Sequence, residues 1–96
     1  MPPRTGGLSE GYMRLKTRID ESDVIKVVAD SNPKRNGSKS RFRFACYRDG
    51  MSVAEYRQAV GRERGDYEAG KCTLDLRWDS ERHYIRIERN GRPLNP

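Results

Sequence analysis

The stretch that decides the fold is Asp49-Gly50-Met51-Ser52-Val53-Ala54-Glu55-Tyr56-Arg57-Gln58-Ala59-Val60-Gly61, which carries the start and the stop signals of one helix. Ser52 is a preferred N-cap residue, and Glu55 stands three positions later, at the spacing of a capping box. Gly61 is the residue type that ends helices in the left-handed conformation. We therefore predict a helix from Val53 to about Val60. Its inward-facing residues are predicted to be Val53, Tyr56, Ala59 and Val60.

A second helix is predicted to precede this one. Residues 30–37 (Asp-Ser-Asn-Pro-Lys-Arg-Asn-Gly) are rich in turn-forming types, so they predict a linker, and Ser38 or Ser40 can begin a helix behind it. Apolar residues at helical spacing, above all Phe44 and Tyr47, give this helix a broad inward face. That face is predicted to consist of Phe42, Phe44, Ala45, Cys46 and Tyr47.

The chain before the linker is predicted to contain a tail and two strands. Residues 1–11 are rich in Gly and Pro and poor in apolar residues, which indicates a flexible tail ahead of a single domain at 12–96. Residues 12–19 alternate apolar and basic side chains, which is typical of a half-buried strand. Residues 24–29 are β-branched and apolar, so they indicate a second strand, and the two could form a hairpin. A short helix within 20–30 is the alternative, and the β-branched density favours the strand.

Residues 71–82 fit two patterns. Apolar residues at every second position from 72 to 78 alternate with polar ones, which slightly favours a strand that pairs with 84–88 in a hairpin. Leu74 and Trp78 also have helical spacing, and in that interpretation His83 takes the left-handed position after the helix. Trp78 fits a core position in both interpretations.

The segments on either side of this region are simpler. Residues 61–70 are polar and contain three glycines, so they predict a loop, in which a short turn around Tyr67 is left open. Residues 84–88 are predicted to form a strand in both interpretations, and Arg-Asn-Gly-Arg at 89–92 has the composition of a tight hairpin turn. Pro93 restricts any returning strand to an edge.

The composition points to a single small domain with a polyanionic partner. Hydrophobic residues make up 33% of the 96-residue chain and charged residues 35%, and the net charge is +6. Two cysteines and one histidine are too few for a disulfide framework or a zinc site, so no metal or cofactor is expected. No apolar run is long enough for a membrane span, and the N-terminus lacks a secretory signal pattern. We therefore expect a cytoplasmic protein with free thiols.

Three segments together resemble bacterial winged helix-turn-helix domains. They are SRFRFACYRDGM at 40–51, SVAEYRQAVG at 52–61 and LDLRWDSERHYIRIE at 74–88. The run at 32–40 is also similar to small bacterial or phage proteins. The resemblance implies an α+β fold with a three-helix core and a C-terminal β-hairpin wing, to which the N-terminal strand pair is an addition. It also implies a recognition helix that ends before His83.

The positive charge is concentrated in one part of the sequence. Residues 33–48 contain six basic residues and no acidic one, whereas 49–96 contain nine of each sign. Such a basic run is typical of phosphate contacts, and Arg89 and Arg92 of the wing can reach a groove of the DNA. The alternative is that part of this run is only the solvated outer face of a helix. The predicted nucleic-acid contacts are Lys34, Arg35, Lys39, Arg41, Arg43, Lys71, Thr73, Arg77, Arg89 and Arg92.

The function expected from these patterns is duplex DNA binding, mainly through phosphates, by a small transcriptional regulator or a phage- or plasmid-related factor. A protein-interaction module on the same scaffold and an RNA-binding domain are the alternatives. No catalytic constellation is recognisable, so no enzyme is expected. The aromatic residues fall at core spacing and do not predict a stacking platform for single strands. Homodimerisation through an exposed edge strand at 12–19 is left open.

Overall fold

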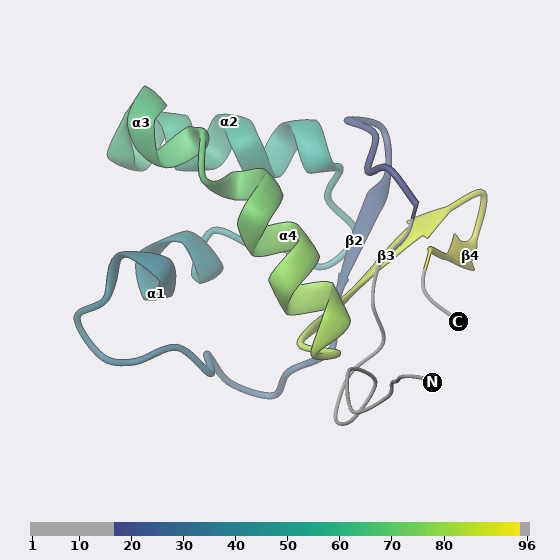
Figure 1. Ribbon diagram of the computed structural model, residues 1–96, viewed down its shortest axis with the longest axis horizontal. Coiled ribbons are helices and arrows are strands. Elements are labelled where there is room, and N and C mark those ends of the chain that lie inside the picture. The colour runs from purple at the N-terminus through teal and green to yellow at the C-terminus, as the bar shows by residue number, and fades with distance from the viewer. Residues whose placement is uncertain (1–16, 95–96) are drawn as a thin grey trace, which may run out of the picture.

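The computed structural model describes residues 17–94 and shows an α+β fold with a three-stranded antiparallel sheet (Figure 1). In chain order the elements are β2 (Val24–Val27), α1 (Lys39–Phe44), α2 (Val53–Arg64), α3 (Asp66–Ala69), α4 (Cys72–Glu81), β3 (Ile85–Arg89) and β4 (Arg92–Pro93). The predicted tail and most of the strand predicted at 12–19 lie outside the described residues. Its last three positions, 17–19, are described and are not in a strand.

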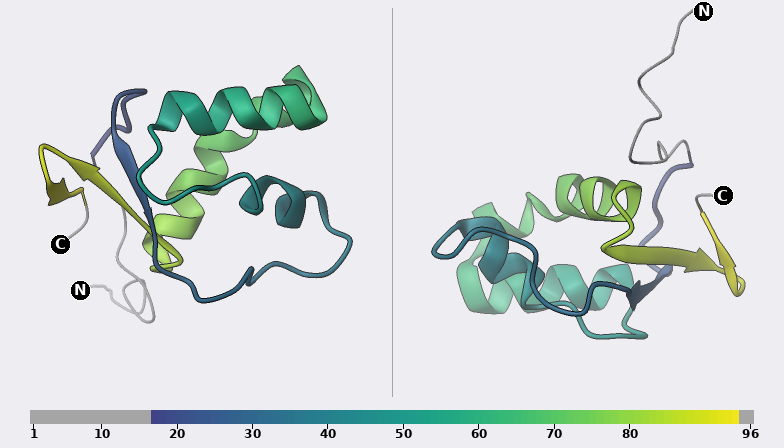
Figure 2. Two further views of the ribbon diagram at one scale, coloured as in Figure 1. Left: turned by 180° about the vertical axis from the view of Figure 1, so that it is seen from behind. Right: turned by 90° about the horizontal axis from the view of Figure 1, so that it is seen from below.

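Among the described residues the sheet has β3 at its centre, and the first strand of the predicted N-terminal hairpin lies mostly outside them. β2 pairs with β3, with Ile25 opposite Ile87, and β4 pairs with the other edge of β3. Pairing Ile25 with Ile87 buries both side chains completely and directs both toward the core. The tight turn at Asn90 and Gly91 is confirmed, because both have positive φ (55° and 77°). Figure 2 shows that this hairpin extends away from the helices.

The outer edge of β2 is also occupied. The Ile25 N–H donates to the Met51 carbonyl, the Gly50 N–H donates to the Ile25 carbonyl, and both distances are 2.7 Å. Two residues further along β2, the Val27 N–H donates to Asp49 Oδ1 at 2.9 Å. The segment that leads into α2 therefore runs beside β2 and satisfies its backbone groups.

The helix that organises the chain, α2, starts as predicted but ends one turn later. The Ser52 hydroxyl accepts from the Glu55 N–H, and the Glu55 carboxylate accepts from the Ser52 N–H, so the capping box is confirmed. Gly61 does not end the helix. Gly65, with φ 93°, forms its C-cap. The prediction of a loop over 61–70 was therefore wrong at 61–64, which form the last turn of α2, and the short turn left open around Tyr67 is the four-residue helix α3.

The first helix, α1, begins as predicted behind Ser38, whose hydroxyl accepts from the Arg41 N–H. Phe44 and Tyr47 are buried as expected. Phe42 is 47% exposed, however, and Ala45 is exposed as well, so the predicted broad apolar face is narrower than expected. Arg43 takes an inward position in their place.

Residues 72–81 are helical, so the slightly favoured strand interpretation was wrong and the helical alternative was right. His83 has φ 61°, as that alternative requires. The inner face of α4 consists of Cys72, Asp75, Leu76, Asp79 and Ser80, all buried or half-buried. Two carboxylates on that face broke the apolar periodicity that would have indicated a helix. Trp78 is 52% exposed, so its assignment to the core was also wrong.

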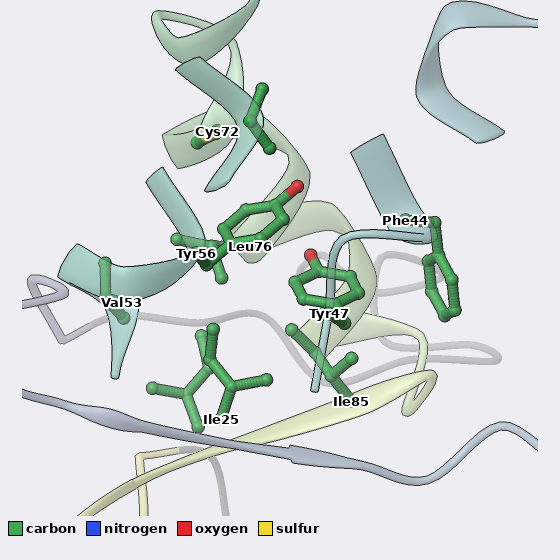
Figure 3. Close-up of a cluster of buried hydrophobic side chains, with 10 residues drawn as sticks. Ile25, Phe44, Tyr47, Val53, Tyr56, Cys72, Leu76 and Ile85 are labelled. Carbon is green, nitrogen blue, oxygen red and sulfur yellow. The ribbon is translucent and has the colours of Figure 1, made fainter. Parts of the chain in front are cut away.

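The core lies between the sheet and the helices. Tyr47 and Tyr56 stack with ring centroids 4.3 Å apart, and Phe44 packs edge-on against Tyr47 at 4.9 Å (Figure 3). The fully or nearly fully buried apolar residues are Ile25, Phe44, Tyr47, Val53, Tyr56, Val60, Cys72, Leu76, Ile85 and Ile87. Of the predicted inward residues of α2, Val53, Tyr56 and Val60 are confirmed, and Ala59 is half-buried.

Candidate nucleic-acid interface

Arg43, one of the predicted phosphate contacts, is buried and neutralised inside the fold. Its guanidinium donates to Glu68 Oε1 at 2.5 Å and to both oxygens of Asp75. The hydrogen bond to Asp75 raises the pKa of Arg43 above its usual value, and the hydrogen bond to Glu68 raises it further. The Tyr56 hydroxyl also donates to Asp75, at 3.4 Å. Arg43 therefore joins α1 to α3 and α4.

Lys34, from the linker before α1, is also committed internally. Its Nζ lies 2.5 Å from Asp79 Oδ1, and the Tyr47 hydroxyl donates to the second oxygen of Asp79 at 2.8 Å. Asp79 is only 1% exposed, and its burial raises the pKa of the carboxyl, against the opposing effect of Lys34. Lys34, which the sequence predicted to contact nucleic acid, thus balances a buried carboxylate.

Two further predicted contacts hold the backbone or a carboxylate of this chain. Arg89 Nε donates to Asp23 Oδ1 at 2.7 Å, and its hydrogen bond holds the pKa of the Asp23 carboxyl below the usual range. Arg41 Nη1 donates to the carbonyls of Lys34 at 2.8 Å and Asn32 at 3.4 Å. Arg41 therefore fixes the linker against α1.

The other predicted residues lie on separate parts of the surface. Arg35, Lys39 and Arg92 are exposed, but α1 and β4 stand at opposite ends of the molecule (Figure 1). Lys71 lies over the ring of Tyr67, with Nζ 4.9 Å from the centroid. Thr73 is exposed and accepts from Arg57 at 3.2 Å, and Arg77 is half-buried on α4. The ten predicted residues do not form one surface.

A groove between α1 and α2 brings together a different set of cations. Its volume is about 720 Å³. We call it the α1–α2 groove, and its lining residues are Phe42, Ala45, Cys46, Arg48, Met51, Glu55, Gln58, Ala59, Arg62, Glu63 and Arg64. Arg48, Arg62 and Arg64 are all exposed. A smaller hollow lined by Lys39, Glu63, Arg64 and Glu68 adjoins it through the residues that the two share.

Arg62 and Arg64 are not among the contacts predicted from the sequence, because Gly61 was taken as the end of the helix. With α2 extended to Arg64, these two side chains continue the helix that lines the groove. Arg64 lies over the ring of Phe42, with Cζ 3.8 Å from the ring centroid. A Gly within a helical pattern is tolerated, so a test of helical spacing beyond residue 61 could have found these cations.

The two cysteines differ in environment. Cys46 lines the groove, is half-buried, and its thiol donates to the Phe42 carbonyl at 3.5 Å. Burial raises its pKa, so the thiol is neutral at physiological pH. Cys72 is fully buried, and burial raises its pKa to about 11. Within residues 17–94 no cluster of three His, Cys, Asp or Glu side chains could hold a metal ion, and no helix is long and apolar enough to cross a membrane.

Comparison of the chain with protein-family models, with curated proteins and with solved structures gave no match.

Proposed function

We propose that this protein binds nucleic acid, with duplex DNA as the expected form, and holds it mainly by phosphate contacts in the α1–α2 groove. The observation that carries this proposal is the group of three exposed guanidiniums, Arg48, Arg62 and Arg64, on one groove. Arginine is well suited to this role, because its planar fork binds phosphate oxygens in pairs.

The charge balance of the groove supports an anionic ligand. Two carboxylates, Glu55 and Glu63, line it together with the three arginines. The Glu55 carboxylate already accepts the Ser52 N–H at 2.8 Å, where it serves the capping box. Lys39, in the adjoining hollow, adds a further exposed cation. The chain as a whole carries +6, which would attract a polyanion from solution.

The winged-helix resemblance adds a second element to the proposal. The order α1, α2, α4 and the β3–β4 hairpin agrees with the order that the resemblance implies. In that arrangement α4 would enter the major groove and present Lys71, Thr73 and Arg77. Variants separate the two elements of the proposal. Arg77→Ala reduces affinity if α4 meets the DNA, whereas Arg62→Ala reduces it if the phosphates lie in the α1–α2 groove.

The experiment is a fluorescence-anisotropy titration of a labelled duplex of random sequence at about 50 mM and about 200 mM salt. Binding should weaken by about tenfold or more over this range, because each phosphate contact releases counterions. The double variant Arg62→Glu/Arg64→Glu should abolish binding. Arg18→Glu removes an exposed cation that is not part of the groove. It changes the net charge by two, so it is the matched control for each single variant, Arg62→Glu and Arg64→Glu. If neither duplex nor single strands bind at micromolar protein, the proposal is wrong.

A protein-interaction module is the second candidate function, because α3 and α4 expose large apolar side chains. Tyr67, Leu74 and Trp78 are 72%, 66% and 52% exposed. Trp and Tyr are the residue types that dominate binding energy at protein interfaces. Trp78 is the sole tryptophan of the chain, so a protein partner on α4 would shift its fluorescence at salt concentrations that remove DNA.

A further inference from the structure

An aromatic ring stands among the cations of the α1–α2 groove. Phe42 is 47% exposed, although the sequence pattern assigned it to the core. The guanidinium of Arg64 lies over its ring, with Cζ 3.8 Å from the ring centroid, in the geometry of a cation–π contact. Exposed rings are the feature that a stacking platform needs and that the sequence did not reveal.

Besides Phe42, part of the groove lining is apolar. Ala45, Met51 and Ala59 contribute methyl and thioether groups, and Cys46 contributes a neutral thiol. The same groove is also lined by the three arginines. An unpaired nucleotide has a matching division, with a flat base that prefers stacking and a phosphate that prefers cations. Paired bases are stacked inside their own helix, so a duplex can offer only its phosphates to this groove.

We propose that the α1–α2 groove binds a nucleic-acid strand with unpaired bases more tightly than a fully paired duplex. One base stacks on the exposed part of the Phe42 ring and extends the stack that Arg64 begins. The flanking phosphates are held by Arg48 and Arg62. This inference rests on the proposed phosphate binding, and it replaces duplex DNA by an unpaired strand as the form of nucleic acid that the groove binds best.

The size of the groove is consistent with this ligand. Its volume of about 720 Å³ lies within the range of pockets that hold small organic groups, about 300–1,000 Å³. A purely structural role for Phe42 is the competing explanation, in which Arg64 only covers an exposed ring. In that case loss of the ring would change the stability of the protein, and the preference for strands with bases over strands without bases would stay the same.

The test compares three labelled probes of equal length by fluorescence anisotropy. They are an oligothymidine strand, a strand made of abasic sites, and a blunt duplex. The abasic strand keeps the phosphates and removes the bases, so it isolates stacking. The unmodified protein should bind oligothymidine about 5- to 150-fold more tightly than the abasic strand, the range expected for one base stacked on an aromatic side chain.

Two variants locate the effect. Phe42→Leu keeps an apolar side chain without the ring and should remove most of the preference for oligothymidine, while affinity for the abasic strand and the duplex stays the same. Tyr67→Leu is the matched control, because Tyr67 is an exposed ring with a stacked cation that does not line the groove. It should leave the affinity for all three probes unchanged.

The outcomes are distinct. Equal binding of oligothymidine and the abasic strand by the unmodified protein overturns this inference, and it leaves phosphate binding in place. That comparison requires no variant, so it decides the question even if Phe42→Leu fails to fold. A preference for bases that Phe42→Leu retains also overturns the inference, since the base then lies elsewhere. Failure of all three probes to bind removes the proposed function as well.

Discussion

Lys34 and Asp79 form an ion pair that joins the linker before α1 to the inner face of α4, with Nζ 2.5 Å from Oδ1 across 45 positions of sequence. The carboxylate of Asp79 is almost completely buried, and the lysine side chain is 11% exposed. A buried carboxylate is tolerated only when it is paired and hydrogen-bonded. Lys34 of the basic linker is thus part of the fold, and its charge is not available to a ligand.

Lys34→Met should destabilise the protein by about 3 kcal/mol at neutral pH, because it leaves Asp79 buried without its cation. Burial already raises the pKa of Asp79, and loss of Lys34 raises it further. An acid with a raised pKa in the folded state costs stability where it is ionised. The defect should therefore shrink as the pH falls toward the unfolded value of 3.8 and Asp79 takes up a proton.

Urea denaturation followed by circular dichroism at several pH values measures this effect. Arg35→Met is the control, since its side chain is exposed and such changes alter stability by about 0.5 kcal/mol or less. A defect that stays constant between neutral and acidic pH would show that Asp79 is not the group left unpaired.

Arg43→Met should destabilise the fold by about 3 kcal/mol or more, because the guanidinium is shared by Glu68 and Asp75. Arg43→Lys keeps the charge but loses the geometry of the fork, so its effect should be intermediate. Arg48→Met removes an exposed arginine and serves as the comparison. Thermal unfolding of the three variants gives the order, and equal melting temperatures for Arg43→Met and Arg48→Met would contradict a buried role for Arg43.

Gly61→Ala and Gly65→Ala should have opposite effects on stability. Gly61 is inside α2, and a Cβ placed there would meet only the Cβ of Ala69 at 3.7 Å, an ordinary contact. Alanine should therefore stabilise the helix by about 0.5–1 kcal/mol. Gly65 has φ 93° and ψ 171°, a region open almost only to glycine, so alanine there should cost about 1–3 kcal/mol.

Chemical denaturation of this pair tests the extent of α2 directly. If α2 ended at Gly61, as its sequence suggests, then Gly61→Ala would be the destabilising change and Gly65→Ala would be nearly neutral.

The thiols should react one at a time. A maleimide should modify Cys46 slowly in the folded protein, since the groove is open to solvent but burial raises the pKa of this thiol. Cys72 should react only after denaturation, because it is fully buried and its pKa is about 11. Intact-mass measurement should show one adduct in buffer and two in urea, matching the two cysteines of the chain. Cys46→Ser should show none in buffer, and an adduct there would place Cys72 at the surface.

Local signals in the sequence were sufficient for the starts of α1 and α2 and for the hairpin turn. Ser38 and Ser52 cap helices with their own side chains, and Asn90 and Gly91 adopt the positive φ values of a tight turn. Each of these depends on residues only a few positions apart. The same signals failed at Gly61, because the residue type that ends a helix is also accepted inside one at a modest cost.

Long-range ion pairs account for most of what the sequence could not predict. Arg43 and Asp75 are 32 positions apart, so neither is recognisable as buried from its neighbours. Asp75 and Asp79 are polar residues that face inward, and their positions next to apolar residues gave the sequence of α4 the alternation of a strand. The candidate groove was missed for a related reason. Its cations are Arg48, which precedes α2, and Arg62 and Arg64, which lie in the last turn of α2, so only the fold shows that they line one groove.

The hydrogen bonds between residues 49–53 and β2 have a consequence for self-association. An open strand edge is a template for strand addition by another chain, which is the first step of many aggregation processes. Met51 and Asp49 already accept the N–H groups of Ile25 and Val27 along that edge. At the opposite edge of the described sheet, β4 has only two residues, and Pro93 has no N–H to donate. The segment that starts α2 therefore also protects residues 17–94 from strand addition at the edge of β2.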